Sequence, residues 1–368
     1  MDTNTKSQLD EALFYDGITH LIIDLENCQY VSSAGLRSIL SAKKAMDKLG
    51  GEFFVTNVPV EIYEVFNTTG FTDIMNIAKA LREISLEGLE YMAECACGEC
   101  YRLNDEEVVK MYKEGFEFYV AENEKQRAKI AFILGVPTAI SYDMVKCGKR
   151  FGVVYELLNA EMLSTVLIRE PEKMDEYAKL HSELLKTFHV AKPDKSMLED
   201  VNATIAEALE AIREYFTADE IEKLKEYLSI LPKGDVLVHY DLHTNNVMVQ
   251  DGELIVIDMG ELCYGSIYMD LTAVYGVFGC KEVDMCESII HMDKNQGYTY
   301  WEYFAKHYFE NMPEEKAFFE KNCLKFTALW IANAVAWAPS LRESFIKITR
   351  AVMSKIETSS KLASDEKV

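Results

Sequence analysis

Three oxygen-bearing side chains in the second half of the chain have the types and spacing that phosphate chemistry requires. Asp241 and Asn246 lie in a polar loop between two short apolar runs, and Asp258 follows a third apolar run. Moving a phosphoryl group to a hydroxyl needs a carboxylate that orients the hydroxyl. It also needs a neutral oxygen ligand and a second carboxylate that hold magnesium on a triphosphate. We therefore predict that these three residues are catalytic, with Asn246 and Asp258 as the magnesium ligands.

The histidines around this loop raise a second interpretation. His239 and His243 flank Asp241 in an arrangement that zinc hydrolases also use. Zinc would require further ligands and an open coordination position, and the other histidines stand in contexts without ligand spacing. The zinc interpretation also leaves Asn246 and Asp258 unexplained. We therefore favour the magnesium site and expect His239 to give structural support to the loop, and Gly260 to permit the backbone turn behind Asp258.

A lysine inside an apolar strand is the next candidate. Lys110 lies in the run Val108 to Tyr112, and a buried ammonium needs a carboxylate or a phosphate as its partner. The alternative is a lysine whose head group reaches solvent from a strand edge. The helix expected at residues 118–134 carries Glu122 and Glu124, and either could reach Lys110. We favour Glu124.

The elements around Lys110 resemble the small lobe of a protein kinase. Residues 89–112 are typical of a β-hairpin followed by a third strand. The resemblance implies that Gly98 belongs to the nucleotide-binding loop and that Lys110 holds the α- and β-phosphates of ATP. It also implies that the strand at residues 151–158 leads into a hinge, where backbone groups from Glu156 to Leu158 bind adenine.

The catalytic loop resembles that of one family in particular. Its H-x-D-x-x-x-x-N pattern and the following I-D-x-G are similar to those of the aminoglycoside phosphotransferase and choline kinase family. The segment from Gly265 to Leu271 also resembles a pattern of that family, with Ser266 and Ile267 departing from it, and we take Asp270 as structural support. The resemblance implies an α+β bilobal protein-kinase-like fold. It implies a kinase that uses ATP and Mg²⁺ to phosphorylate an alcohol group, and an acceptor pocket in an aromatic-rich helical lobe.

The first 80 residues form a separate pattern of alternating helices and strands. Strands are expected at residues 20–25 and 52–58, with helices at 5–14, 32–50 and 60–66, which indicates a small α/β unit. The segment from Leu21 to Arg37 resembles the STAS domain, the fold of the anti-sigma-factor antagonists. In regulatory members of that family the serine that corresponds to Ser33 is phosphorylated. The alternative is that Ser32 or Ser33 only caps the helix.

Two departures from the STAS pattern affect these expectations. The family usually has an acidic residue where this chain has Ser32, and it usually begins with two strands that have no counterpart here. We therefore expect the small sheet to lack its first strands. An exposed sheet edge invites pairing with another chain, so a homodimer formed through this edge is a hypothesis, and light scattering that finds only monomer would exclude it.

These patterns predict a STAS-like domain at residues 1–80 and a kinase-like domain at residues 83–358, with a small lobe at about 83–158 and a large lobe at about 159–358. The expected function is phosphorylation of a small-molecule hydroxyl, coupled to a STAS-like domain that regulates or binds a protein partner. Two alternatives stay open. One is a signalling kinase that phosphorylates Ser33 or a partner's serine, and the other is a non-catalytic, nucleotide-sensing, partner-switching protein.

Charge and cysteine content limit the remaining classes. The chain has 368 residues and 61 acidic against 38 basic side chains, a net charge of −23, which disfavours nucleic acid and anionic membranes as partners. Residues 1–80 hold only 11 of the acidic and 6 of the basic side chains, so the kinase-like part is strongly acidic and a cationic acceptor is favoured. Nine cysteines without an export signal indicate reduced thiols and a cytoplasmic location. We interpret the cluster of Cys95, Cys97 and Cys100 as a loop feature, not a zinc site.

Overall fold

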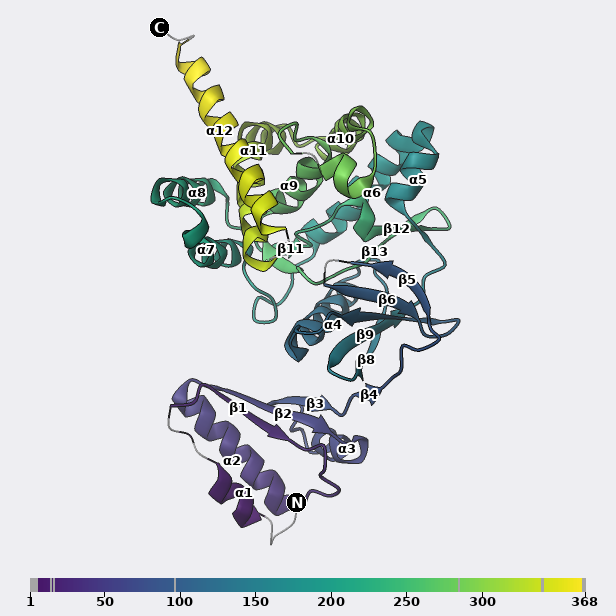
Figure 1. Ribbon diagram of the computed structural model, residues 1–368, viewed down its shortest axis with the longest axis vertical. Coiled ribbons are helices and arrows are strands. Elements are labelled where there is room, and N and C mark those ends of the chain that lie inside the picture. Colours follow the sequence, from purple (N-terminus) through teal and green to yellow (C-terminus); the bar gives the residue numbers. More distant parts are fainter. Residues whose placement is uncertain are drawn as a thin grey trace. The chain divides into compact units, whose positions relative to one another are not determined.

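The structure is a computed structural model that describes residues 6–365 apart from residues 14, 16, 96, 284, 339 and 340. The chain divides into two compact units (Figure 1). The first contains residues 1–85 and 145–148, and the second contains residues 86–144 and 149–368. No helix among the described residues is both long enough and apolar enough to cross a membrane.

The first unit is a three-stranded parallel sheet with helices, as the alternating pattern predicts. The sheet order is β1-β2-β3, so β1 lies at an edge, and α1 is the element that precedes it among the described residues. The elements in chain order are α1 (Lys6–Ala12), β1 (His20–Asp24), α2 (Ser33–Leu49), β2 (Glu52–Val58), α3 (Val60–Thr68), β3 (Asn76–Lys79) and β4 (Arg82–Glu83).

Helical spacing explains how α2 is anchored to this sheet. Ile39, Ala42 and Met46 recur on one face of the helix and are fully buried, together with Phe53 and Val55 of β2. The helix ends where a glycine supplies a left-handed residue, because Gly50 has φ +69° and its N–H donates to the carbonyl of Asp47. The apolar face therefore fixes the helix, and with it the loop that precedes Ser33, on the sheet.

The second unit begins with an antiparallel sheet and one helix. Its strands lie in the order β8-β9-β7-β6-β5, and α4 packs against β9. In the register of this sheet Lys110 pairs with Val153 on one side and with Cys100 on the other. The elements are β5 (Glu90–Glu94), β6 (Gly98–Arg102), β7 (Glu107–Tyr112), α4 (Phe118–Ile133), β8 (Ser141–Cys147) and β9 (Arg150–Glu156).

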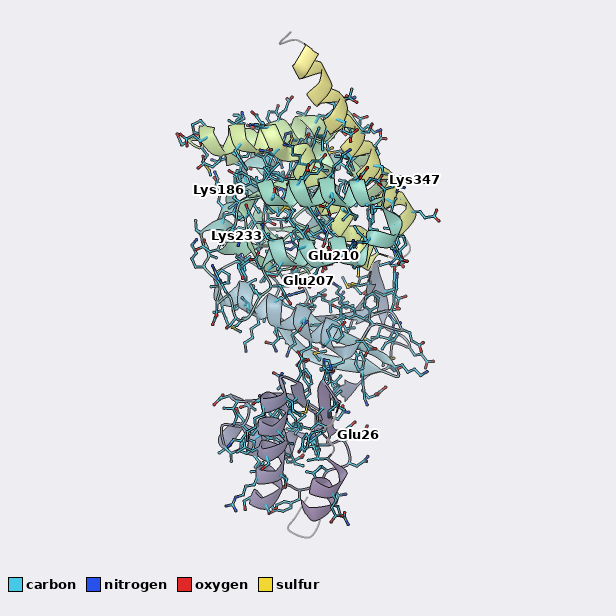
Figure 2. All side chains as sticks on the ribbon, turned by 90° about the vertical axis from the view of Figure 1, so that its left-hand side faces the viewer. Glu26, Lys186, Glu207, Glu210, Lys233 and Lys347 are labelled. Carbon is cyan, nitrogen blue, oxygen red and sulfur yellow. The ribbon has the colours of Figure 1, made fainter. Side chains whose placement is uncertain are left out.

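The rest of the second unit is mainly helical. Its helices are α5 (Leu163–Arg169), α6 (Met174–Val190), α7 (Val201–Ala211), α8 (Ala218–Ile230), α9 (Ile267–Phe278), α10 (Lys294–Tyr308), α11 (Pro313–Trp337) and α12 (Arg342–Asp365). Its short strands are β10 (Glu161–Met162), β11 (Val236–Val238), β12 (Val247–Gln250), β13 (Glu253–Val256) and β14 (Cys263–Gly265). Exposed charged side chains cover its outer helices, among them Glu207 and Glu210 on α7 and Lys347 on α12 (Figure 2).

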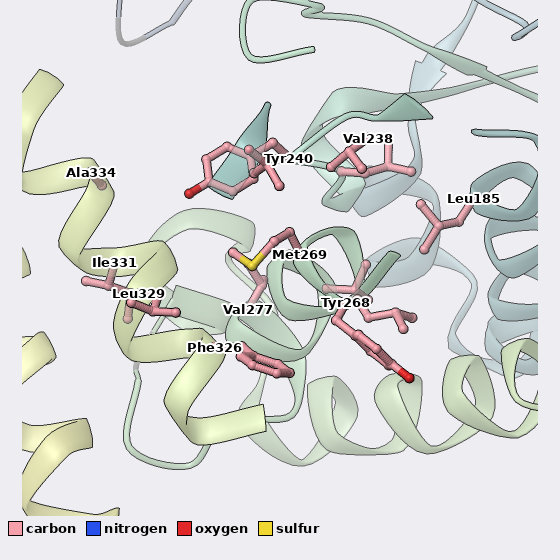
Figure 3. Close-up of a cluster of buried hydrophobic side chains, with 14 of the residues drawn as sticks. Leu185, Val238, Tyr240, Tyr268, Met269, Val277, Phe326, Leu329, Ile331 and Ala334 are labelled. Carbon is pink, nitrogen blue, oxygen red and sulfur yellow. The ribbon is translucent and has the colours of Figure 1, made fainter. Parts of the chain in front are cut away.

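One apolar core holds the catalytic segments of the sequence in place. Leu185 of α6, Val238 of β11, Met269 of α9 and Phe326 of α11 converge in it, and all four are fully buried (Figure 3). A capping box is present at the start of α8, where Thr217 and Glu220 bond to each other's backbone N–H. Between β12 and β13 the turn contains Asp251 at φ +52° and Gly252 at φ +85°, the left-handed pair that tight hairpins favour.

Candidate active site

Lys110 is a buried cation held between two carboxylates. Only 6% of the residue is exposed. Its Nζ lies 2.9 and 3.0 Å from the two carboxylate oxygens of Glu124 and 2.9 Å from Oδ1 of Asp258. Burial alone would lower the pKa of Lys110, but the charges of Asp258 and Glu124 outweigh burial and raise it well above its usual value. Glu124, and not Glu122, is therefore the helix residue that meets Lys110.

Glu124 is bound by more groups than the sequence indicated. The hydroxyl of Tyr155 donates to its Oε1 at 2.7 Å, and the hydroxyl of Tyr112 donates to its Oε2. Together with Lys110, these donors satisfy a carboxylate that is only 2% exposed. Tyr112 and Tyr155 come from β7 and β9, which flank each other in the sheet, so their convergence depends on strand pairing that the sequence does not reveal.

Asp270 fixes the backbone of the catalytic loop. Its carboxylate is fully buried and accepts the backbone N–H groups of His239 at 3.1 Å and Tyr240 at 2.6 Å. It also lies 3.1 Å from Nε2 of His189, a residue that the sequence analysis missed. Tyr240 has φ +73°, which a bulky residue adopts only under constraint, and the indole N–H of Trp330 holds its carbonyl at 3.1 Å. The loop geometry is therefore imposed from α9 and α11.

His239 supports the loop from inside as a neutral ring. It is fully buried, its Nδ1 accepts the N–H of Asp241 at 3.3 Å, and its Nε2 lies 3.4 Å from the carbonyl of Ile257. Burial lowers the pKa of His239. A neutral ring with its proton on Nε2 satisfies both contacts, because Nδ1 then accepts and Nε2 donates.

Asp241 and Asn246 form a polar pair at the end of this loop. The amide Nδ2 of Asn246 donates to the backbone carbonyl of Asp241 at 2.9 Å and to its Oδ2 at 3.3 Å. Burial raises the pKa of Asp241 to about 7, with the charge of Asp258 adding to the effect while His239 opposes it. Asp241 is therefore a carboxylate whose pKa lies near neutrality, and the amide nitrogen of Asn246 is fixed on it.

Asp258 lies beyond β13 in a constrained turn. Asp258 itself has φ +61°, so the left-handed backbone conformation of this turn occurs at Asp258. The sequence had indicated Gly260 as the residue that permits the turn. The guanidinium of Arg127, one turn after Glu124 on α4, donates to the carbonyl of Gly260. Burial alone would raise the pKa of Asp258, but Lys110 outweighs it and lowers the pKa. Asp258 is thus ionised beside the loop of Asp241.

The remaining predicted residues are spread around this centre. Glu156 ends β9, and its N–H already donates to the carbonyl of Ile140 at 2.9 Å, so adenine would have to use other backbone groups between Glu156 and Leu158. Gly98 begins β6, where a Cβ atom would lie 2.3 Å from the carbonyl oxygen of Met111. Glycine is therefore required there by the close approach of β7.

The side chains of Asn246 and Asp258 carry oxygen ligands of the kind that magnesium binds. An amide oxygen and an ionised carboxylate are hard oxygen ligands, and Mg²⁺ usually takes one or two such side chains and completes its shell with water and phosphate oxygens. Because Nδ2 of Asn246 is bonded to Asp241, its amide oxygen is free to face a cation. By the type of their ligand atoms, the two side chains therefore suit Mg²⁺.

Ser33 lies apart from these residues, in the first unit. It is the first residue of α2 and is exposed, whereas the preceding Ser32 is the cap, with its hydroxyl oxygen accepting the N–H of Gly35 at 3.3 Å. The structure therefore separates the two serines that the sequence left as alternatives for the helix cap.

Two family models match the chain. The STAS domain matches residues 3–84, and the phosphotransferase enzyme family matches residues 121–302. Among curated proteins, the anti-sigma F factor antagonist of Paenibacillus polymyxa is 31% identical over 85 residues, which are 22% of this chain and 73% of that protein. An anti-sigma-B factor antagonist of Staphylococcus aureus is 30% identical over 80 residues, 21% of this chain and 74% of that protein.

Solved structures share the fold of most of the chain. The ADP-bound aminoglycoside phosphotransferase APH(2'')-Ib is 20% identical with a TM-score of 0.51, covering 80% of this chain and 96% of that one. An ethanolamine kinase of Plasmodium vivax is 15% identical with a TM-score of 0.52, covering 91% of this chain and 97% of that one. At this identity the likeness concerns the fold. The chain thus belongs to the STAS family through its N-terminal part, and its second part, which matches the phosphotransferase enzyme family model at residues 121–302, has the kinase-like fold that the sequence predicted.

Proposed function

We propose that the protein is an ATP- and magnesium-dependent phosphotransferase that moves the γ-phosphate to a hydroxyl of a small molecule. The observation that carries the proposal is the position of Lys110 between Glu124 and Asp258. Lys110 and Glu124 come from a strand and the helix that follows it, whereas Asp258 is 148 positions from Lys110. A buried lysine with two carboxylates is costly unless it serves a site.

Each residue would have a defined task in this reaction. Lys110 would bind the α- and β-phosphates, with Glu124 holding its ammonium in place. Asn246 and Asp258 would hold Mg²⁺, which supplies charge neutralisation on the triphosphate when bound. Asp241 would orient the acceptor hydroxyl and take its proton, and a pKa of about 7 suits a base that works near neutrality.

The acidity of the second unit supports a cationic acceptor. Outside residues 1–80 the acidic side chains strongly outnumber the basic ones, and Glu261 adds a half-buried carboxylate just after the Asp258 turn. Burial raises the pKa of Glu261 to about 7, with Arg127 opposing and Asp241 adding. Structures of the same fold include complexes with gentamicin and with hygromycin B, and an ethanolamine kinase. A hydroxyl-bearing amine is therefore the acceptor class to test first.

The test is ADP formation by the full chain with magnesium and ATP, across a panel of hydroxyl-bearing amines and neutral alcohols. We expect at least one amine to stimulate turnover. Asp241→Asn should lower kcat by about 100-fold or more, because it removes the proton acceptor. Asp251→Asn is the matched control, since Asp251 is exposed and asparagine tolerates its positive φ. An equal loss in both variants, or turnover that survives Asp241→Asn, would contradict the assignment.

A second candidate is phosphorylation of a STAS serine by the kinase-like domain. The exposure of Ser33 at the first turn of α2, together with the anti-sigma factor antagonists among the relatives, favours it. In that case the STAS domain would be a substrate and a regulator, and the acceptor hydroxyl would belong to a protein.

A further inference from the structure

Three thiols lie around the tight turn that joins β5 to β6. Cys95 and Gly98 exchange backbone hydrogen bonds of 2.9 and 3.4 Å, which close the turn. The carbonyl of Cys97 accepts the N–H of Lys113 at 2.9 Å, so the turn is also tied to the end of β7. Cys100 pairs with Lys110 in the sheet register. The cysteines therefore lie on the hairpin beside the strand that carries Lys110.

Two of these thiols are in direct contact. The Sγ atoms of Cys95 and Cys97 are 3.7 Å apart, within hydrogen-bond distance for sulfur, and both residues are half-buried. Both have free thiols. In its protonated form the Cys95 thiol also donates to the carbonyl of Gly98 at 3.3 Å, a bond that it gives up when it ionises. The pair is thus held in a geometry in which one sulfur can attack the other.

The charges around the pair favour one thiolate and one thiol. The hydrogen bond from the Cys97 thiol lowers the pKa of Cys95 to about 7; burial opposes this effect and the Lys110 ammonium adds to it. The same hydrogen bond and burial raise the pKa of Cys97. Burial raises the pKa of Cys100 to about 12, so that sulfur stays protonated. A thiolate next to a cation is the reactive form of cysteine.

We propose that Cys95 and Cys97 form a thiol oxidation site at which a hydroperoxide converts the pair into a disulfide, and that this disulfide weakens nucleotide binding. The first part of the proposal, the thiol reaction, is independent of the protein's activity. The second part, the loss of nucleotide affinity, rests on the proposed function.

The reaction balances with the hydroperoxide as the oxidant. The Cys95 thiolate attacks the outer oxygen of the hydroperoxide, so an S–O bond forms, the O–O bond breaks and an alcohol leaves after taking up a proton from water. The Cys97 sulfur then attacks the sulfenic acid, so the S–S bond forms, the S–O bond breaks and water leaves with the Cys97 proton. In total two thiols lose two electrons, and the hydroperoxide becomes an alcohol and water.

The disulfide would change the turn because the two sulfurs must approach from 3.7 Å to about 2 Å. Two of its described residues have little room to adjust. Gly98 is already so close to the backbone of Met111 that no Cβ atom fits, and Cys97 is bonded to Lys113. The shift would therefore reach β7, the strand of Lys110.

The experiment treats the reduced full-length protein with hydrogen peroxide, maps its cysteines by mass spectrometry, and measures ATP affinity by calorimetry before and after. We expect a Cys95–Cys97 disulfide, an ATP affinity at least tenfold weaker, and recovery with dithiothreitol. In Cys97→Ser, Cys95 should instead stop at a sulfenic acid that dimedone captures. Cys147→Ser is the matched control, because Cys147 is also half-buried, and it should respond as the unchanged protein does.

Two results would overturn the proposal. Cys95 and Cys97 that stay free while other cysteines are oxidised would exclude the reaction, and a Cys95–Cys97 disulfide that leaves ATP affinity unchanged would exclude its effect. A reduced protein that binds no ATP would contradict the proposed function instead, and the cysteine map would still decide the thiol reaction.

Discussion

At the scale of single residues, the charge on Lys110 is the most constrained feature of the second unit. A buried ammonium is tolerated because Glu124 and Asp258 surround it, and Glu124 is in turn fixed by the hydroxyls of Tyr112 and Tyr155. Replacing Glu124 leaves Lys110 with Asp258 as its remaining charged partner in this group and leaves the two tyrosine hydroxyls without a full acceptor, which costs more than an exposed ion pair contributes.

Glu124→Gln tests this arrangement. We expect it to lower the free energy of unfolding by about 2 kcal/mol and ATP affinity by tenfold or more, because the amide has no charge to hold the Lys110 ammonium and offers one acceptor oxygen in place of two. Urea unfolding and calorimetric titration measure the two effects. Glu122→Gln is the control on the same helix, because Glu122 makes no contact with Lys110 among the described residues. Equal effects of the two substitutions would show that the contact between Glu124 and Lys110 contributes nothing specific to stability or to ATP affinity.

His181 makes the stability of the second unit depend on pH. It is fully buried in α6, with Nδ1 2.8 Å from the hydroxyl of Tyr300 and with no partner for Nε2 in the described part of the chain. Burial lowers its pKa to about 3, with the nearby His243 and His239 adding to the effect. The unfolded chain takes up this proton below about pH 6.5, so stability is complete above that pH and is lost as pH falls toward 3.

We expect the His181 contribution to reach about 2 kcal/mol between pH 6.5 and pH 5. The three tryptophans, Trp301, Trp330 and Trp337, all lie in the second unit, so their fluorescence in urea reports its unfolding. The loss of stability on acidification should be smaller by about this amount in His181→Gln than in the unchanged protein. The exposed His20 provides the control substitution. If His181→Gln loses as much stability on acidification as the unchanged protein, His181 is not the group responsible.

At the scale of elements, the catalytic loop is a short segment held in an unfavourable conformation by its neighbours. Tyr240 at φ +73° rarely adopts this angle without constraint, and Asp258 at φ +61° does so less readily than glycine. Asp270 at the start of α9, which receives two consecutive backbone N–H groups of the loop, supplies much of the constraint. The loop therefore has its catalytic conformation before any ligand binds.

Asp270→Ala should destabilise the second unit by about 3 kcal/mol, because it leaves two buried N–H groups and a histidine without their acceptor. Tryptophan fluorescence during urea unfolding measures this loss, and Asp251→Asn is the exposed control. Asp270→Asn keeps one acceptor oxygen, so its loss of stability should lie between those of Asp270→Ala and Asp251→Asn. If Asp270→Ala unfolds like the control, other contacts must hold Tyr240 in place.

The sequence predicts elements well where local periodicity determines them. The strand before α2, the helix itself with its left-handed Gly50, and the capping box of α8 all follow from short-range patterns. β8 has no such signal, because its residues alternate irregularly between exposed and buried positions, and the sequence analysis did not place it. The family of the second part was identified because H-x-D and I-D-x-G are local motifs with fixed spacing, and that of the first part because the segment from Leu21 to Arg37 is one continuous local pattern.

The sequence predicts less of the site where residues meet across the fold. Lys110 and Asp258 are 148 positions apart, and His189 and Asp270 are 81 apart, so only packing brings each pair together. The choice between Glu122 and Glu124 depended on the rotation of α4 against β9. The positive φ of Asp258 was missed because glycine is the usual residue at such positions, and Gly260 was taken for it.

At the scale of the whole molecule, the chain combines a STAS domain with a second part that has a kinase-like fold. The STAS domain presents Ser33 at the exposed start of α2, a helix of 17 residues whose first N–H groups have no partner within the helix. A phosphate there would be favoured by these N–H groups and by the helix dipole. Ser33 is therefore the residue that we propose to test as an acceptor within this chain.

Radiolabelled ATP tests whether it does so. If the kinase-like domain acts on the STAS domain, the intact protein should incorporate label from ATP, and Ser33→Ala should lose at least nine-tenths of it. Asp241→Asn should lose it equally, because the catalytic carboxylate belongs to this chain. Ser32→Ala is the matched control, since it removes the helix cap, at a cost of about 1 kcal/mol, without removing the exposed hydroxyl. Label that persists in Ser33→Ala would place the acceptor elsewhere. An intact protein without label would exclude self-phosphorylation and leave the small-molecule acceptor as the substrate to pursue.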